Sequence, residues 1–194
     1  MKGFTLIELI VSVAIFTVVM VIAVGALLAV SAGERKAETL KSVMDNLNFT
    51  LESMTRSIRT GYDYGCPTRG TNCTNGGPKI IFTSSEGDVN YEYCLSTDAT
   101  SNGCSTSTTC PALATGGTCR ILRRIAEETL FTPMTASEVN IKHFAFYVRG
   151  APIGSADDTQ SNVVITLSGT VKVSETQTSD FNLQTSVTQR LYDS

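Results

Sequence analysis

The chain begins with a long apolar segment bounded by two glutamates. Between Glu8 and Glu34 no residue is charged, so Leu9–Gly33 is a run of 25 almost wholly apolar residues. As an α-helix this run spans about 37 Å, which is enough to cross a hydrocarbon core of about 30 Å. The apolar region of a secretory signal peptide is usually only about 7–15 residues long. The pattern therefore predicts a membrane-spanning helix rather than an ordinary signal peptide cut near Ser31.

After Glu34 the pattern changes from apolar to amphipathic without a helix breaker. Six apolar residues recur at intervals typical of one helix face, and Gly61 follows as a natural end of the helix. These residues are Leu40, Met44, Leu47, Leu51, Met54 and Ile58. We therefore expect one helix from about Phe4 to Thr60, with its second half covered by a globular head domain.

The remainder of the chain is poor in helix signals and shows strand signals instead. The predicted strands are Lys79–Thr83, Val89–Leu95, Arg120–Ala126, Ile141–Arg149, Asn162–Val173 and Phe181–Leu191. Pro133–Thr135 and Gly150–Gln160 are predicted loops. Consecutive strands without helices between them indicate a mainly antiparallel sheet packed on the amphipathic helix. The predicted fold class is therefore α+β.

Composition and charge narrow the class of protein. A length of 194 residues suits one domain, or one domain with an appendage, and only 17% of the residues are charged. The net charge of −3 gives no general attraction to nucleic acid. Arg120, Arg123 and Arg124 form a local basic cluster, but no aromatic residues alternate with them as in a nucleic-acid-binding surface. Nucleic acid is therefore not an expected partner.

Glu8 is the residue that a plain membrane anchor does not explain. A carboxylate at the edge of an apolar helix costs a few kcal/mol unless a cation pairs with it. Cleavage between Gly3 and Phe4 would create an amine on Phe4, four residues before Glu8 and on the same helix face. Glu8 can then pair with an amine, either within its own chain or on a neighbouring helix.

The order Gly3-Phe4-Thr5-Leu6-Ile7-Glu8, followed by the apolar run, resembles the prepilin signature of type IV pilins and type II secretion pseudopilins. The resemblance implies cleavage after Gly3 by a prepilin peptidase and methylation of the Phe4 amine. It also implies that Glu8 pairs with the Phe4 amine of an adjacent subunit during assembly. The implied partners are other pilin or pseudopilin subunits and an inner-membrane assembly platform.

The resemblance also implies a division of the whole chain into four segments. It implies a leader at 1–3, an apolar helix at 4–33, the amphipathic half of that helix at 34–60, and a β-rich head at 61–194. The stretch Phe181–Arg190 is similar to the last strand of J-type minor pseudopilins and related minor pilins, which favours a minor subunit. The expected location is the cytoplasmic membrane, with a single span and the head outside the cytoplasm, followed by a periplasmic or extracellular filament. The expected role is structural, without catalysis or a cofactor.

Two other classes stay open. A membrane-tethered or secreted enzyme would have a deep pocket with titratable groups of shifted pKa in its head, and processing near Ala29 or none. A DNA- or ligand-binding pilin would need the cluster at Arg120–Arg124 to be exposed and joined by other basic residues. His143 is the only histidine in the chain, so no Ser-His-Asp or Cys-His arrangement can be recognised.

The cysteines predict disulfide bonds in the head. All six lie within 54 residues, in a region rich in Gly, Ser and Thr: Cys66, Cys73, Cys94, Cys104, Cys110 and Cys119. An even number in an exported domain predicts three disulfides. Fifteen pairings are possible, and we expect Cys66–Cys73, Cys104–Cys110 and Cys94–Cys119, the last bridging neighbouring strands.

Metal sites are weaker hypotheses. Zinc is disfavoured because the chain has no Cys-x-x-Cys motif and a single histidine. Asp157 and Asp158 lie in a predicted loop, and some pseudopilins bind calcium in such loops. Their loop lacks the ligand spacing of a known calcium site, so we interpret it as a solvated turn with these two residues as weak calcium candidates.

Overall fold

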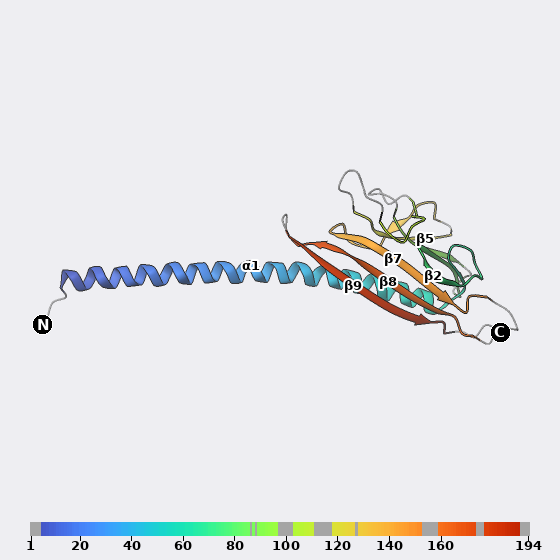
Figure 1. Cartoon of the computed structure of the whole chain (residues 1–194), viewed down its shortest axis with the longest axis horizontal. Helices are drawn as coiled ribbons and strands as arrows, with labels where there is room; N and C mark the ends of the chain where they lie inside the picture. The colour runs from blue at the N-terminus through green and yellow to red at the C-terminus, as the bar shows by residue number, and fades with distance from the viewer. Residues whose placement is uncertain are drawn as a thin grey trace. The chain divides into compact units, whose positions relative to one another are not determined.

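The computed structural model describes residues 5–85, 87, 89–96, 103–110, 118–126, 128–152, 159–173 and 177–190. This part of the chain contains one helix, α1 (Leu6–Arg59), followed by nine strands (Figure 1). The strands are β1 (Gly61–Gly65), β2 (Cys73–Gly77), β3 (Lys79–Ser84), β4 (Asn90–Leu95), β5 (Ile121–Ile125), β6 (Thr132–Pro133), β7 (Val139–Arg149), β8 (Asn162–Lys172) and β9 (Thr178–Thr188). The predicted α+β class is confirmed. The chain divides into two compact units, Met1–Lys41 and Ser42–Ser194.

The C-terminal end of α1 is fixed by a side chain from the first strand. The Tyr64 hydroxyl contacts the Ile58 carbonyl at 2.6 Å and the Gly61 carbonyl at 2.5 Å, and it is buried. These contacts use acceptors that the end of a helix otherwise leaves unsatisfied. Arg56 and Arg59 occupy the last turn, where positive charge interacts favourably with the helix dipole. The helix therefore ends at Arg59, one residue before the predicted end at Thr60.

The buried face of α1 differs in part from the predicted one. Within the second unit, the buried residues of the helix are Val43, Leu47, Thr50, Met54 and Ile58. Met44 is 37% exposed and Leu51 is half-buried, although both belong to the predicted apolar stripe. Thr50 is buried because its hydroxyl contacts the carbonyls of Asn46 at 2.9 Å and Met134 at 3.0 Å. Thr50 thus occupies a core position that the apolar pattern assigned to Leu51, and its two hydrogen bonds satisfy the buried hydroxyl.

The strands form two antiparallel sheets, where the sequence predicted one. The first sheet has the order β1-β3-β4-β5-β6 and the second β2-β7-β8-β9. Six of these strands lie where they were predicted, although β9 begins three residues early, at Thr178 rather than Phe181. β1, β2 and β6 were not predicted, because the first two are rich in glycine and polar residues and the third has only two residues. Pro133, placed in a loop by the sequence, lies in edge strand β6, where its missing N–H is tolerated.

The chain changes sheets twice near the start of the head. After β1 it leaves the first sheet, pairs β2 with β7 of the second, and returns to the first sheet as β3. The β2–β7 register places Cys73 opposite Val148 and Gly77 opposite Phe146, with an irregularity between them. This crossover connects the two sheets directly.

One hydrophobic core joins the second half of α1 to both sheets. On the side of the first sheet it contains an aromatic cluster centred on Phe82, which is buried. The Phe82 ring centroid lies 5.9 Å from Tyr64, 5.5 Å from Tyr91 and 5.9 Å from Tyr93. These distances lie within the range at which aromatic pairs add stability beyond simple burial.

Two buried tyrosines of this cluster differ in how their hydroxyls are satisfied. The Tyr64 hydroxyl contacts two carbonyls, whereas the buried Tyr93 hydroxyl lies near the Ser57 side chain but forms no hydrogen bond of normal geometry with any described residue. We predict that Tyr64→Phe lowers the free energy of unfolding by about 1 kcal/mol, the usual net value of one buried hydrogen bond. Tyr93→Phe should leave it unchanged or raise it by up to about 1 kcal/mol, because a desolvated, unpaired hydroxyl is removed. Thermal or denaturant unfolding of the full chain in detergent measures both, and an equal loss in the two variants would contradict the assignment.

Candidate functional site

The N-terminal turn of α1 contains the start of the candidate assembly site. The helix begins at Leu6, and the Thr5 carbonyl accepts hydrogen bonds from the backbone N–H groups of Glu8 at 3.1 Å and Leu9 at 3.3 Å. Glu8 lies in the first turn with its side chain exposed. The partial positive charge of a helix N-terminus favours a carboxylate at this position. Gly3 and Phe4, the predicted cleavage and methylation residues, lie outside the described residues.

The first half of α1 exposes its apolar side chains. Every Val, Leu, Ile, Met and Phe from Leu6 to Val30 has an exposed fraction between 49% and 78%. Among the described residues, α1 is the one helix long and apolar enough to cross a membrane. A helix that is apolar on all sides is stable only in an apolar environment, such as a bilayer or a bundle of similar helices.

The two hydroxyl groups between Leu6 and Val30 are satisfied within the helix. The Ser12 hydroxyl contacts the carbonyls of Glu8 at 2.8 Å and Leu9 at 3.0 Å. The Thr17 hydroxyl contacts the carbonyls of Val13 at 3.0 Å and Ala14 at 2.8 Å. Polar groups paired in this way do not need water, so they do not oppose burial in lipid or in a helix bundle.

The disulfides of the head differ from the predicted pairs. Cys94 bonds to Cys104 and Cys110 bonds to Cys119, so the predicted pairs Cys104–Cys110 and Cys94–Cys119 are wrong. Cys66 and Cys73 are thiols in the structure, and both are buried. The cysteines of the two disulfides are consistent with an exported head.

The register of the strands explains the first disulfide. The pairing of β4 with β5 places Cys94 opposite Leu122, which is beyond Cys119 in the sequence. Cys104 instead reaches the end of β4, because it forms a β-bridge with Ser96. Cys104 therefore lies next to Cys94 in space.

The second disulfide is positioned by β7. The Cys110 N–H donates to the Lys142 carbonyl at 2.8 Å, and the Ile141 N–H donates to the Cys119 carbonyl at 3.0 Å. The Cys119 N–H also donates to Asn140 Oδ1 at 3.0 Å. Both cysteines are thus held against the same strand, a contact that their sequence spacing does not indicate.

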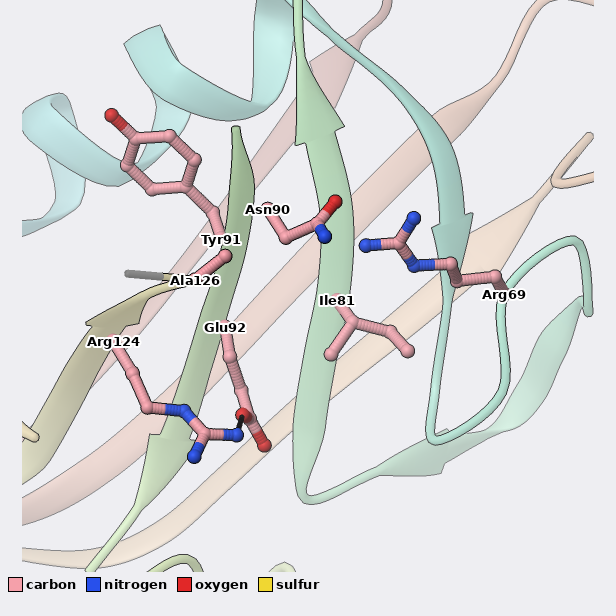
Figure 2. Close-up of a pocket in the computed structure, with 7 residues that line it drawn as sticks. All are labelled: Arg69, Ile81, Asn90, Tyr91, Glu92, Arg124 and Ala126. Carbon is pink, nitrogen blue, oxygen red and sulfur yellow. Dashed lines mark hydrogen bonds and ion pairs between the residues drawn. The ribbon is translucent and has the colours of Figure 1, made fainter. Parts of the chain in front are cut away.

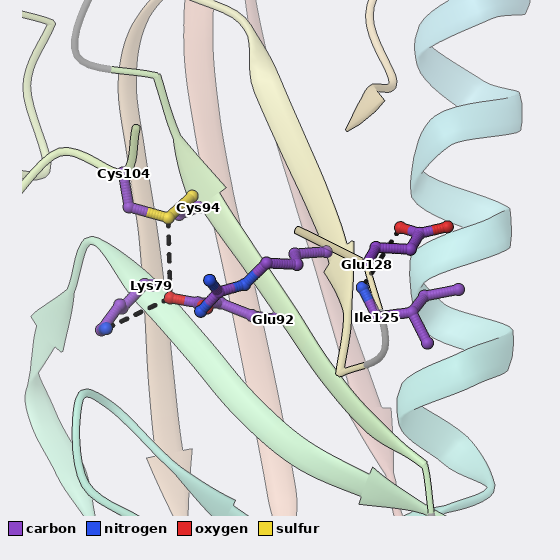
Figure 3. A network of polar contacts seen from close by, with 7 residues as sticks. Lys79, Glu92, Cys94, Cys104, Ile125 and Glu128 are labelled. Carbon is purple, nitrogen blue, oxygen red and sulfur yellow. Dashed lines mark hydrogen bonds and ion pairs between the residues drawn. A yellow bond between two sulfur atoms is a disulfide. The ribbon is translucent and has the colours of Figure 1, made fainter. Parts of the chain in front are cut away.

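A charged network on the first sheet supports the Cys94–Cys104 bond. The Glu92 side chain is only 10% exposed and pairs with Lys79 at 3.2 Å and with Arg124 at 2.5 Å. The sulfur of Cys104 lies 3.6 Å from the same carboxylate (Figure 3). Glu92 was not among the predicted site residues, because only the strand register brings it next to its partners.

Glu92 also lines a pocket of about 300 Å³ on this sheet. The lining residues are Arg69, Ile81, Asn90, Tyr91, Glu92, Arg124 and Ala126. Figure 2 shows Arg69 and Arg124 on either side of Asn90 and Glu92, with the tyrosine ring directed away from them. Arg124 pairs with Glu92, and Arg69 pairs with Asp63 at 3.4 Å and donates to the Thr83 hydroxyl at 3.0 Å. Each charged group in the pocket is therefore already neutralised by a neighbour within the chain.

The groups with shifted pKa values lie elsewhere. Burial raises the pKa of the Cys66 thiol and of the Tyr93 hydroxyl. A hydrogen bond from its own backbone lowers the pKa of Glu138. None of the three lines the pocket around Glu92.

Two of the three arginines in the predicted basic cluster are engaged within the head, whereas the buried Arg123 Nε has no hydrogen-bond partner among the described residues. The Arg120 guanidinium donates to the Thr135 carbonyl at 2.5 Å and 3.0 Å. Arg124 pairs with Glu92, and its guanidinium lies 4.8 Å from the centre of the Phe131 ring. These two arginines are used to hold the head together, which weakens the DNA-binding alternative.

His143 belongs to no candidate metal centre in the part of the chain that the structure describes. His143 is half-buried on β7, where the register shifts after Ile141, and it lines a pocket of about 300 Å³ together with Thr166 and Leu167. Asp157 and Asp158 lie outside the described residues. Among the residues that the structure does describe, no group of three or more His, Cys, Asp and Glu side chains could hold a metal ion.

Comparison with known proteins gives one match. Residues 1–24 match the family model of the prokaryotic N-terminal methylation motif. No curated protein and no solved structure matches the chain. The motif supports a type IV pilin-like structural subunit, processed by a prepilin peptidase and assembled with other subunits. The match does not reach Phe181–Arg190, the stretch that resembles J-type minor pseudopilins.

The burial of Glu92 leads to a stability prediction. We predict that Glu92→Gln lowers the free energy of unfolding by about 1 kcal/mol, because two ion pairs lose their shared carboxylate while Lys79 and Arg124 stay partly solvated. Asp180→Asn is the matched control, since the Asp180 side chain is 82% exposed in its 3.4 Å pair with Lys142. The control should change stability by less than about 0.5 kcal/mol. Denaturant unfolding compares the two, and a Glu92→Gln effect no larger than that of the control would contradict the structural role of the network.

Proposed function

We propose that this chain is a minor structural subunit of a type IV pilus or a type II secretion pseudopilus, and that it acts by assembly rather than catalysis. The observation that carries the proposal is the methylation motif at residues 1–24, continued by a helix half that buries no large apolar side chain against its own chain. The proposed organisation is a leader at 1–3, an apolar helix at 4–33, its amphipathic continuation at 34–60, and a head at 61–194.

The proposed path leads from the membrane to the filament. The newly made chain spans the cytoplasmic membrane once, with its head outside the cytoplasm, where an oxidising environment suits the disulfides. Prepilin peptidase cuts after Gly3, and the new Phe4 amine is methylated. The assembly platform then transfers the subunit from lipid into a bundle of similar helices. This transfer keeps the apolar side chains out of water at both stages.

Glu8 sets the axial position of the subunit in this proposal. Its carboxylate lies in the first turn of α1, next to an apolar segment that offers no cation. In the filament it pairs with the Phe4 amine of an adjacent subunit. A displaced subunit would leave both charges unpaired in apolar surroundings, which costs several kcal/mol. The pair therefore favours one register between neighbours.

The minor role rests on the C-terminal strand. Phe181–Arg190 includes most of β9, an edge strand of the second sheet. The likeness of this stretch to the last strand of J-type minor pseudopilins and related minor pilins supports a minor subunit. Glu8 does not separate minor from major subunits, because helical assembly is open to both.

The role of Glu8 can be tested by substitution. We predict that Glu8→Leu reduces incorporation into filaments at least about tenfold, because it leaves the amine of a neighbour unpaired in apolar surroundings. Insertion into the membrane should be unchanged, since the apolar run is intact. Glu34→Gln is the control, because Glu34 lies at the other end of that run. The measurements are the subunit content of sheared filaments and the fraction that resists alkaline extraction from membranes. Normal incorporation of Glu8→Leu would reject the register role.

A further inference from the structure

Cys66 and Cys73 flank the segment in which the chain crosses from one sheet to the other. Cys66 directly follows β1 of the first sheet, and Cys73 is the first residue of β2 in the second. Both side chains are 8% exposed and belong to the shared hydrophobic core. The two thiols therefore meet at the crossover, away from solvent.

The two thiols are neighbours in the folded chain. Burial and the neighbouring Cys73 side chain both raise the pKa of the Cys66 thiol. A Cβ atom added to Gly77 would lie 2.8 Å from the sulfur of Cys73 and 3.2 Å from that of Cys66, so the glycine packs against both sulfurs at once. The other contact of the Cys66 sulfur is long, at 3.9 Å to the Phe146 carbonyl. Both sulfurs therefore border the same residue, Gly77 of β2.

We propose that Cys66 and Cys73 are oxidised to a third disulfide, which fastens the crossover between the two sheets. The bond closes the loop at 67–72 and ties the start of β2 to the end of β1. β2 is a five-residue edge strand, and its pairing with β7 is irregular between Cys73 and Gly77. A covalent link there restricts the unfolded chain and keeps the strand on β7.

The oxidant is a protein dithiol oxidoreductase in its disulfide form. The Cys73 thiolate attacks one sulfur of the oxidant disulfide, which forms a mixed disulfide and releases the first oxidant thiolate. The Cys66 thiolate then attacks the Cys73 sulfur and releases the second. Two thiols of the chain are oxidised, and one disulfide of the oxidant is reduced to two thiols.

The folded chain protects this pair from later exchange. Because burial raises the pKa of the Cys66 thiol, the reactive thiolate is scarce once the core has formed. The oxidation therefore belongs to the folding stage, before the crossover is covered. After folding, the bond is shielded from reductants by the same burial.

Peptide mapping of the wild-type protein tests the proposal directly, and this test does not depend on filament assembly. The full chain is purified in detergent after export, unfolded in guanidinium with an alkylating reagent and no reductant, and digested. We expect no alkylated cysteine at either position and a peptide pair linked through Cys66 and Cys73. Full alkylation of both residues, or linkage of either to another cysteine, would overturn the proposal.

Substitutions give a second, independent readout. Cys66→Ser, Cys73→Ser and the double variant each lose the same bond, so we expect all three to lower Tm by a similar amount, about 5 °C. Single effects that add in the double variant would mean that the two cysteines share no bond, since the loss of one shared bond cannot be counted twice. Additive shifts would therefore overturn the proposal, even if the individual shifts are large. The Cys94→Ser/Cys104→Ser variant is the matched control, in which the Cys66–Cys73 peptide pair should persist.

Discussion

The structure depends on one constraint: the first half of α1 cannot bury its apolar side chains against its own chain. Each large apolar side chain between Leu6 and Val30 is about half exposed or more. Full burial of one such side chain is worth about 1.5–3 kcal/mol, so the whole segment represents some tens of kcal/mol. This free energy is recovered only in lipid or among similar helices, and the internally paired Ser12 and Thr17 hydroxyls remove the main polar obstacle to either environment. Glu8 is the remaining polar group of this segment, which makes it the natural place for a specific contact between subunits.

The head, by contrast, buries its apolar side chains within the chain, in a core shared between the second half of α1 and two sheets. The chain moves from one sheet to the other and back within β1–β3, so the sheets can separate only if β2 loses its pairing with β7 or β1 and β3 lose theirs. Two disulfides add covalent links to the head: Cys94–Cys104 joins Cys104 to β4 beside the Glu92 network, and Cys110–Cys119 joins two cysteines that are held against β7. The proposed third disulfide would complete the set at the crossover itself. Covalent links suit these segments because they contribute few apolar side chains of their own.

The sequence was sufficient for features that local chemistry determines. Consecutive residues define the apolar run, the motif around Glu8 and the strands with alternating side chains. The helix and six strands were therefore predicted correctly. Features set by distant segments were not predictable in the same way. The disulfide partners of Cys94 and Cys119 depend on the β4–β5 register and on contacts with β7. Thr50 is buried because Met134, far along the chain, accepts its hydrogen bond, and the glycine-rich β1 and β2 are strands only because neighbouring strands pair with them.

The central claim is that this chain is processed and methylated as a prepilin before its helix enters a filament. The most direct measurement is the intact mass and N-terminal peptide of the protein recovered from membranes and filaments. The account predicts a chain that begins at Phe4 and carries one additional methyl group on its N-terminal amine. A chain that retains Met1 or Lys2, or one that begins near Ala29 or Ser31, would contradict it.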